Sequence, residues 1–236
     1  MAMPEKYRQF GNELVELLKL RTMPVAVKML EKRETPENAL LPKRDLGKHL
    51  TLCQAFSLVR REGRSVAMFK EDYWCVWPVI ALGLVECTKK CVDEVHDKMF
   101  IKDPALSRQV FENSFPRLEY GRYAGMLLSP LPKTEFIPDV ILVYANPAQM
   151  ILLINGLQWA GYKKLEWGAV GESACADSWG RALATGEPSL ALPCFPERRY
   201  GGVPDDELLM ALKPAQLAQA VEGVKSVVND LKPSAG

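Results

Sequence analysis

Histidine is scarce in this chain, since only two occur among its 236 residues. A zinc or non-haem iron centre built mainly on imidazole is therefore a poor interpretation. An excess of charge of one sign is also lacking, because 30 Lys and Arg stand against 29 Asp and Glu and leave a net charge of +1. The composition thus predicts neither nucleic acid nor an anionic membrane as the partner.

Long uninterrupted apolar runs are missing as well. In the first 18 residues, charges alternate with apolar residues at helical spacing, which predicts an amphipathic helix rather than an export signal. The uncharged stretch 140–162 is broken at Asn146-Pro147, which predicts a buried strand and a buried helix rather than a membrane span. We therefore expect a cytoplasmic protein with no membrane partner.

Signatures of several enzyme classes are absent. The chain contains no G-x-x-x-x-G-K-[ST] phosphate loop, no G-x-G-x-x-G after a strand and no G-x-S-x-G nucleophile elbow. Its five tryptophans are not interleaved with basic residues, so a stacking surface for nucleic acid is not supported. These exclusions leave the six cysteines as the residues most informative about function.

The composition itself is that of a globular protein, with 48% apolar and 25% charged residues. Short apolar strands are expected at 24–30, 66–69, 126–128, 139–144 and 190–192, and helices at 51–63, 147–160, 173–184, 205–212 and 215–231. This alternation predicts an α/β or α+β fold, a mixed sheet with flanking helices. We treat residues 1–236 as a single domain.

Two segments of the chain share one pattern: a hydroxyl residue, a cysteine two positions later, a helix, a glycine, a strand and a second cysteine. The members are Thr51, Cys53, Gly63 and Cys75 in the first segment, and Ser173, Cys175, Gly186 and Cys194 in the second. This repetition leaves open two similar halves, 1–119 and 120–236.

The repeated pattern places its cysteines at positions that favour ligand binding. Thr51 and Ser173 are good N-cap residues, so Cys53 and Cys175 would lie in the first helical turn, where the helix dipole lowers a thiol pKa. The second cysteine of each segment follows a strand end, where ligands collect in α/β sheets. Two such units would bring four sulfurs to one seam between the halves.

Four cysteines are therefore the candidate metal-binding and cofactor-binding residues: Cys53, Cys75, Cys175 and Cys194. Ligation by sulfur alone suits an iron–sulfur cluster, our first expectation, or zinc, the second. No three of these cysteines form the tight run of a ferredoxin, so the centre would assemble only on folding.

The other two cysteines have a structural interpretation. Cys87 and Cys91 form a C-x3-C-x4-H spacing with His96, but an apolar helical stripe explains both without a metal. His49 lies four residues before Cys53 and is interpreted as a loop side chain. Neither histidine is needed for the predicted site.

Basic residues near the last cysteine suggest an anionic ligand. Arg198 and Arg199 are candidate anion-binding groups, as is the helix start at Ser173. We therefore expect a small-molecule or redox partner. Two alternatives stay open: a metal-free thiol enzyme acting on an anionic small molecule, with Cys53 or Cys175 as nucleophile, and a non-catalytic ligand-binding module with core cysteines.

Short motifs along most of the chain resemble the domain of unknown function 169 family of archaea and bacteria, many of them anaerobes. The matching pieces are Pro24 to Lys28, Cys53-Gln54-Ala55, Cys75, Ala81 to Leu84, Pro138 to Leu142, Asn146 to Gln149, Cys175-Ala176-Asp177, Leu192-Pro193-Cys194 and Arg198. The resemblance brings no established activity. It implies that Cys53, Cys75, Cys175 and Cys194 belong to the family pattern, whereas Cys87 and Cys91 are peculiar to this protein.

Overall fold

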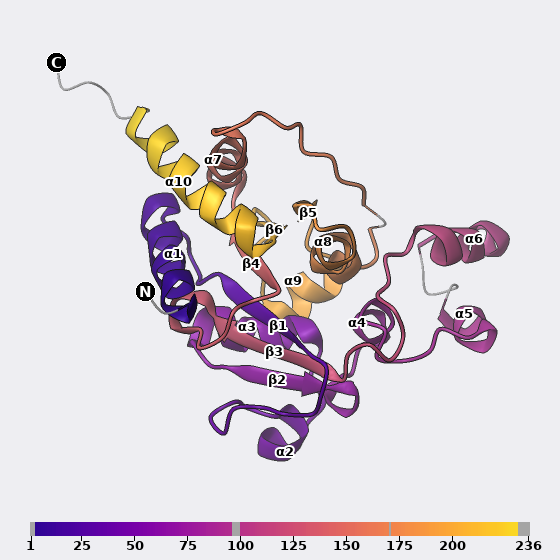
Figure 1. The fold of residues 1–236 in the computed structure, drawn as a ribbon. Coiled ribbons are helices and arrows are strands. Elements are labelled where there is room, and N and C mark those ends of the chain that lie inside the picture. Colours follow the sequence, from indigo (N-terminus) through magenta and orange to yellow (C-terminus); the bar gives the residue numbers. More distant parts are fainter. Residues whose placement is uncertain (1–2, 96–99, 170, 231–236) are drawn as a thin grey trace.

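The computed structural model describes residues 3–95, 100–169 and 171–230 (Figure 1). Six strands form one sheet in the order β2-β3-β1-β4-β6-β5. The strands are β1 (Val25–Leu30), β2 (Val66–Phe69), β3 (Gly125–Pro130), β4 (Val140–Ala145), β5 (Ser189–Ala191) and β6 (Leu208–Leu212). Each neighbouring pair is antiparallel, and isolated parallel bridges join Leu40 to Val66 and Leu50 to Tyr73. The predicted combination of a sheet with flanking helices is confirmed.

The strand order is symmetric about the central pair β1 and β4. The first three strands of the chain lie in the order β2-β3-β1, and the last three continue outward as β4-β6-β5. Each of the first three strands thus has a counterpart among the last three at the same distance from the centre. Two similar halves would give this topology. The division at residues 119 and 120 stays a prediction, and it leaves β3 in the second half, so the symmetry of the strands does not coincide with it.

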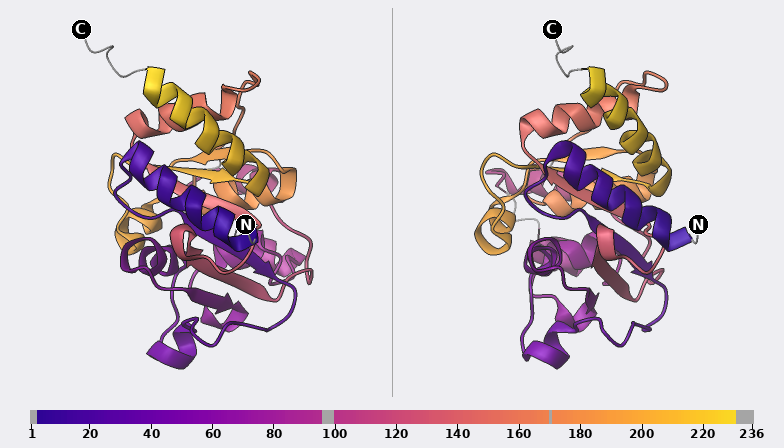
Figure 2. Two further views of the ribbon diagram at one scale, coloured as in Figure 1. Left: turned by 60° about the vertical axis from the view of Figure 1, so that its left-hand side comes forward. Right: turned by 90° about the vertical axis from the view of Figure 1, so that its left-hand side faces the viewer.

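Helices cover both faces of the sheet, as the two views of Figure 2 show. One face packs against α1 (Met3–Leu18), α7 (Pro147–Gln158) and α10 (Pro214–Asp230), and the other against α3 (Leu52–Glu62), α8 (Arg181–Thr185) and α9 (Phe195–Gly201). Side chains of β1 alternate between these two cores: Val25 and Val27 face the α3 side, and Ala26 faces the α1 side. Because both faces are buried, the strands are almost wholly apolar.

Shorter elements complete the described chain. They are α2 (Pro42–Leu46), η1 (Lys70–Asp72), α4 (Val76–Ala81), α5 (Lys89–Val95), α6 (Pro104–Ser114), η3 (Leu131–Lys133) and the π-helix η4 (Ala176–Gly180). In Figure 1, α5 and α6 project beyond α4 from the main body. No helix in the described ranges is both long enough and apolar enough to cross a membrane.

The prediction of a helix at 205–212 is wrong, because residues 208–212 form strand β6. Leucine, methionine and alanine favour a helix intrinsically. In the protein, β6 pairs with β4 on one side and β5 on the other, and four of its five residues are buried. Tertiary pairing therefore outweighs local propensity at this segment.

Candidate functional site

Helix α3 begins with a capping box that fixes the position of Cys53. The backbone amide of Gln54 donates to the Thr51 hydroxyl over 3.1 Å, and the Thr51 amide donates to the Gln54 side chain over 2.9 Å. Cys53 is the second residue of the helix and is buried. The helix ends at Gly63, whose left-handed conformation (φ 71°) favours glycine.

The second segment has a similar cap but a different helix. The Ala176 amide donates to the Ser173 hydroxyl over 3.3 Å, which places the buried Cys175 in the first turn. The next five residues, Ala176–Gly180, form a π-helix before the chain continues as α8. Such π segments are rare and occur frequently at functional sites.

Cys75 and Cys194 are the N-cap residues of α4 and α9. Helix α9 lies directly against the start of α3 at Gly201, where an added Cβ would lie 3.0 Å from the Cys53 carbonyl oxygen and 3.1 Å from the Cys53 Cβ. A glycine at this position therefore allows Cys194 and Cys53 to approach each other.

The structure brings all four predicted cysteines to one small cavity of about 10 Å³. Its lining residues are Leu52, Cys53, Cys75, Trp77, Pro78, Glu172, Ser173, Cys175, Cys194 and Pro196. Four of the six cysteines of the chain thus meet although they come from four separate segments. A cavity of this size holds about one water-sized occupant.

Three of the thiols form a chain of hydrogen bonds. Cys53 is hydrogen-bonded to both Cys175 and Cys194, and the Ala174 amide donates to the Cys194 sulfur. The bond to Cys175 and burial raise the pKa of Cys53 well above its ordinary value, and the bond to Cys53 and burial raise that of Cys194. The hydrogen bond with Cys53 lowers the pKa of Cys175. Burial and the charge of Glu197 together raise it by more, so the net pKa of Cys175 lies above its ordinary value.

The pKa values of Cys53, Cys175 and Cys194 are thus all raised above the ordinary value of a thiol, which favours the neutral form of these three side chains. In the described part of the chain, no group of three or more His, Cys, Asp or Glu side chains is arranged so that it could hold a metal ion. The site thus brings four cysteines together, and Cys53 interacts with both Cys175 and Cys194.

Sequence reasoning missed several polar groups around this cluster. Glu172 lines the cavity, Glu197 raises the pKa values of the thiols electrostatically, and burial together with Cys175 raises the pKa of Tyr73. One carboxyl oxygen of each glutamate and the Tyr73 hydroxyl are buried without a hydrogen-bond partner among the described residues. Buried polar atoms are normally satisfied, so these three indicate a place where a further polar or charged group completes the bonding.

Glu197 is held by a buried network behind the cysteines. The Tyr144 hydroxyl donates to one of its oxygens, and the Arg60 guanidinium stacks over the Tyr144 ring at 4.3 Å. Burial raises the pKa of Glu197, and the Tyr144 bond and Arg60 offset part of that shift. The only sequence feature that could have marked Glu197 as a site residue is its position three residues after Cys194, and that spacing is not specific to any kind of site.

The predicted anion-binding residues are only partly at the cavity. Ser173 lines it, whereas Arg198 and Arg199 are absent from its lining. Arg198 donates to the Pro204 carbonyl over 2.6 Å and lies 3.6 Å from Asp205, so its guanidinium is directed to the loop after α9. Arg199 is exposed.

Cys87 and Cys91 lie outside the cavity, in contact with each other and with an aromatic cluster around Phe111. Burial and the hydrogen bond with Cys87 raise the pKa of Cys91 to about 11. His49 is an exposed residue between α2 and α3, and His96 lies outside the described residues. The predicted single helical stripe through both cysteines is wrong, because α4 ends at Ala81 and α5 begins at Lys89, which leaves Cys87 between the two helices. Both cysteines still pack against this apolar cluster, as their structural interpretation expects.

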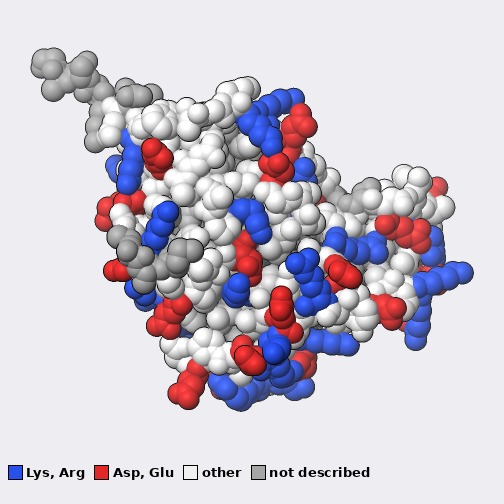
Figure 3. All heavy atoms as spheres, viewed as in Figure 1, with Lys and Arg blue, Asp and Glu red and all other residues white. Residues whose placement is uncertain are grey.

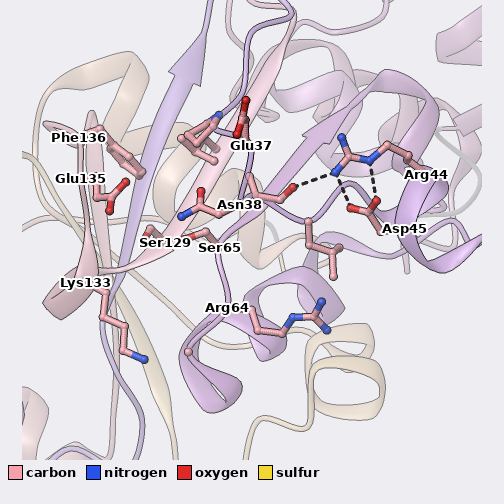
Figure 4. Close-up of a pocket in the computed structure, with 15 residues that line it drawn as sticks. Glu37, Asn38, Arg44, Asp45, Arg64, Ser65, Ser129, Lys133, Glu135 and Phe136 are labelled. Carbon is pink, nitrogen blue, oxygen red and sulfur yellow. Dashed lines mark hydrogen bonds and ion pairs between the residues drawn. The ribbon is translucent and has the colours of Figure 1, made fainter.

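A larger hollow of about 510 Å³ lies beside β2 and β3 (Figure 4). Its lining mixes both signs of charge, namely Glu37, Arg44, Asp45, Arg64, Lys133 and Glu135. Arg44 is bound to the neighbouring Asp45 through two hydrogen bonds of 2.6 and 2.8 Å. Acidic and basic side chains balance in this hollow. They also intermix over the molecular face seen in Figure 3. Neither surface therefore indicates a highly charged partner.

Comparison with known proteins identifies the family. The pattern of DUF169, described as an uncharacterised ArCR family, matches residues 13–223. The chain belongs to this family. The uncharacterized protein MJ0308 of Methanocaldococcus jannaschii is 24% identical over 226 residues, which cover 92% of this chain and 93% of that protein. No solved structure matches the chain.

Proposed function

We propose that this DUF169 protein binds a thiophilic metal centre through Cys53, Cys75, Cys175 and Cys194. The observation that carries the proposal is the meeting of these four cysteines, each at the start of a helix, on one cavity. Free cysteines do serve as core residues. Core packing alone does not explain why the buried polar atoms of Glu172, Glu197 and Tyr73 lack partners among the described residues beside them.

The size of the cavity favours a single ion over a cluster. Sulfurs bound at about 2.3 Å around a tetrahedral zinc ion lie about 3.8 Å apart, which is close to the separation of hydrogen-bonded thiols. Cys53, Cys175 and Cys194 are already hydrogen-bonded to one another, and the cavity measures about 10 Å³. An iron–sulfur cluster needs the sulfurs to move farther apart, so zinc is our first candidate and a cluster the second.

Binding requires a rearrangement of the thiols. The protons that now join Cys194, Cys53 and Cys175 must leave, since a metal binds the thiolate and not the thiol. The sulfurs then turn toward the ion, whose positive charge offsets the mutual repulsion of the thiolates. Because the pKa values are raised, we expect the apparent affinity for zinc to fall steeply as the pH falls from 8 to 6.

The raised pKa values argue against the metal-free thiol enzyme. A nucleophilic cysteine carries a lowered pKa and reacts as a thiolate near neutral pH. The pKa values of Cys53 and Cys175 are shifted in the other direction, and both side chains are buried. The helix starts therefore do not compensate for burial at either thiol.

Metal analysis of the full-length protein tests the proposal. Protein purified without oxygen is assayed for zinc, iron and acid-labile sulfide, and metal-free protein is titrated with zinc and with cobalt, whose thiolate complexes absorb light. We expect one zinc per chain and the loss of binding in Cys75→Ser and Cys194→Ser. The matched controls Cys87→Ser and Cys91→Ser keep full binding.

Three results would contradict the proposal. The first is a folded protein that takes up neither zinc nor an iron–sulfur cluster. The second is an equal effect of the Cys194→Ser and Cys91→Ser replacements. The third is rapid alkylation of Cys53 or Cys175 below neutral pH, which would support the thiol enzyme instead.

A further inference from the structure

A second hollow of about 510 Å³, distinct from that of Figure 4, lies between the C-terminal parts of α1 and α3 and shares no lining residue with the cysteine cavity. It is formed by the segment before β1, the C-terminal part of α3 and the loop before β6, and its lining residues are Val15, Leu20, Arg21, Thr22, Met23, Arg60, Arg61, Pro204 and Glu207. Three of these are arginines and one is an acid. No residue of this hollow was singled out by the sequence.

Arg60 forms the floor of the hollow. Its side chain is 1% exposed, and its Nη1 atom donates to the Thr22 hydroxyl and to Glu207 Oε2, each over 3.1 Å. Thr22 and Glu207 also line the hollow, so the guanidinium lies where its two partners meet that surface. The Tyr144 ring covers the inner side of the guanidinium at 4.3 Å.

One end of this guanidinium is unsatisfied. The Nη2 atom of Arg60 is buried and has no hydrogen-bond partner anywhere in the described ranges. A guanidinium has five N–H donors in a fixed fork, and a buried donor without an acceptor carries an uncompensated desolvation cost. An acceptor that reached this atom from the hollow, after a small shift of the side chains that cover it, would remove this cost.

The charges around the hollow leave one cation in excess. Glu207 forms the ion pair with Arg60 at 3.1 Å, and Arg21 forms a two-pronged pair with Asp206, with both distances 2.7 Å. The bond from Arg61 goes to a neutral acceptor, the Gly202 carbonyl. A single anionic group would balance this charge.

We propose that this hollow binds the carboxylate or phosphate group of a small molecule, with Arg60 Nη2 and the Arg61 guanidinium as donors. Arginine forks match the planar or tetrahedral oxygens of both groups. The apolar side chains of Val15, Leu20 and Met23 line the same hollow and would contact the rest of the molecule. This site does not depend on the metal proposed at the cysteines.

Binding of two simple probes tests the inference. Full-length protein is titrated with inorganic phosphate and with acetate at constant ionic strength, and heat and melting temperature are recorded. We expect saturable binding of one probe, which identifies the class of the ligand, and a rise in melting temperature. Replacement Arg61→Gln weakens that binding about tenfold, since a hydrogen bond to a charged group is lost.

A matched variant separates the site from general charge effects. Arg64→Gln removes the same charge from an exposed position two residues after the end of α3, outside this hollow. It leaves probe binding unchanged. The variant Arg60→Lys keeps the charge but loses the fork, so it also weakens binding, and its fold is checked by circular dichroism.

The inference is overturned by either of two results. One is the absence of saturable binding of both probes to the wild-type protein up to concentrations of about 50 mM, far above an ordinary millimolar dissociation constant. The other is the same loss of affinity in Arg61→Gln and Arg64→Gln.

Discussion

Gly201 controls how closely α9 approaches α3 at the cysteine site. An alanine Cβ there would lie 3.0 Å from the Cys53 carbonyl oxygen, which is closer than nearly all real contacts. We predict that Gly201→Ala destabilises the protein by about 1–3 kcal/mol and weakens zinc binding about tenfold, because α9 must move with Cys194. Urea unfolding and zinc titration measure the two effects.

Gly161→Ala is the control for that change. An added Cβ at Gly161 meets nothing within 4 Å, and the residue has no positive φ. This variant retains wild-type zinc affinity. Equal zinc affinity in Gly201→Ala and Gly161→Ala would show that the approach of the two helices is irrelevant to the site.

The raised pKa of Cys91 predicts how the alkylation rate of this single thiol depends on pH. Burial and the bond with Cys87 raise its pKa to about 11, which favours the neutral thiol. The thiolate fraction, and with it the alkylation rate, should be very low at pH 7 and rise about tenfold per pH unit up to about pH 11. Mass spectrometry of iodoacetamide-treated protein follows this rate. A plateau already reached near pH 8 would contradict the raised pKa.

At the level of elements, helix caps position the thiols. Thr51 caps α3 two residues before Cys53, and Asn146 caps α7 with the same capping-box geometry on the opposite face of the sheet. We predict that Thr51→Ala and Asn146→Ala each cost about 1 kcal/mol of unfolding free energy, as cap removal usually does. Only Thr51→Ala should also lower zinc affinity.

Paired measurements of stability and zinc binding distinguish the two caps. If both variants lose zinc affinity in proportion to their stability, then the cap of α3 supports the fold but does not position Cys53. If neither loses stability, the capping boxes contribute little to this protein.

The element boundaries also show how far sequence patterns reach. The cap at Thr51, the helix behind it and the glycine at its end follow from local rules, and the structure has all three. The π-helix at Ala176–Gly180 and the strand at Leu208–Leu212 do not follow from such rules, because each depends on packing against distant segments. Local sequence predicts where an element begins better than which element it becomes.

At the scale of the whole molecule, the sheet separates two cores that carry different roles. The face away from the cysteines depends on close packing of α7 and α10, where a Cβ at Gly223 would lie 2.1 Å from the Gly156 carbonyl oxygen. We predict that Gly223→Ala destabilises the protein by about 3 kcal/mol, since backbone must move. Under folding conditions its zinc affinity stays that of the wild type.

Urea unfolding combined with zinc titration checks this independence of the two faces. A loss of zinc affinity in Gly223→Ala as large as in Gly201→Ala would show that the helical layers are coupled through the sheet. Unchanged stability would show that α7 and α10 tolerate separation.

The sequence by itself determined the class of fold, the first-turn positions of Cys53 and Cys175, and the choice of the four cysteines, because caps, periodicity and residue chemistry are local properties. Only the tertiary structure decided that these cysteines share a cavity of about 10 Å³, that burial raises the pKa values of Cys53, Cys175 and Cys194, and that buried oxygens of Glu172 and Glu197 lack partners among the described residues. Distances between remote segments and the burial of charge arise from packing of the whole chain, which no local pattern records.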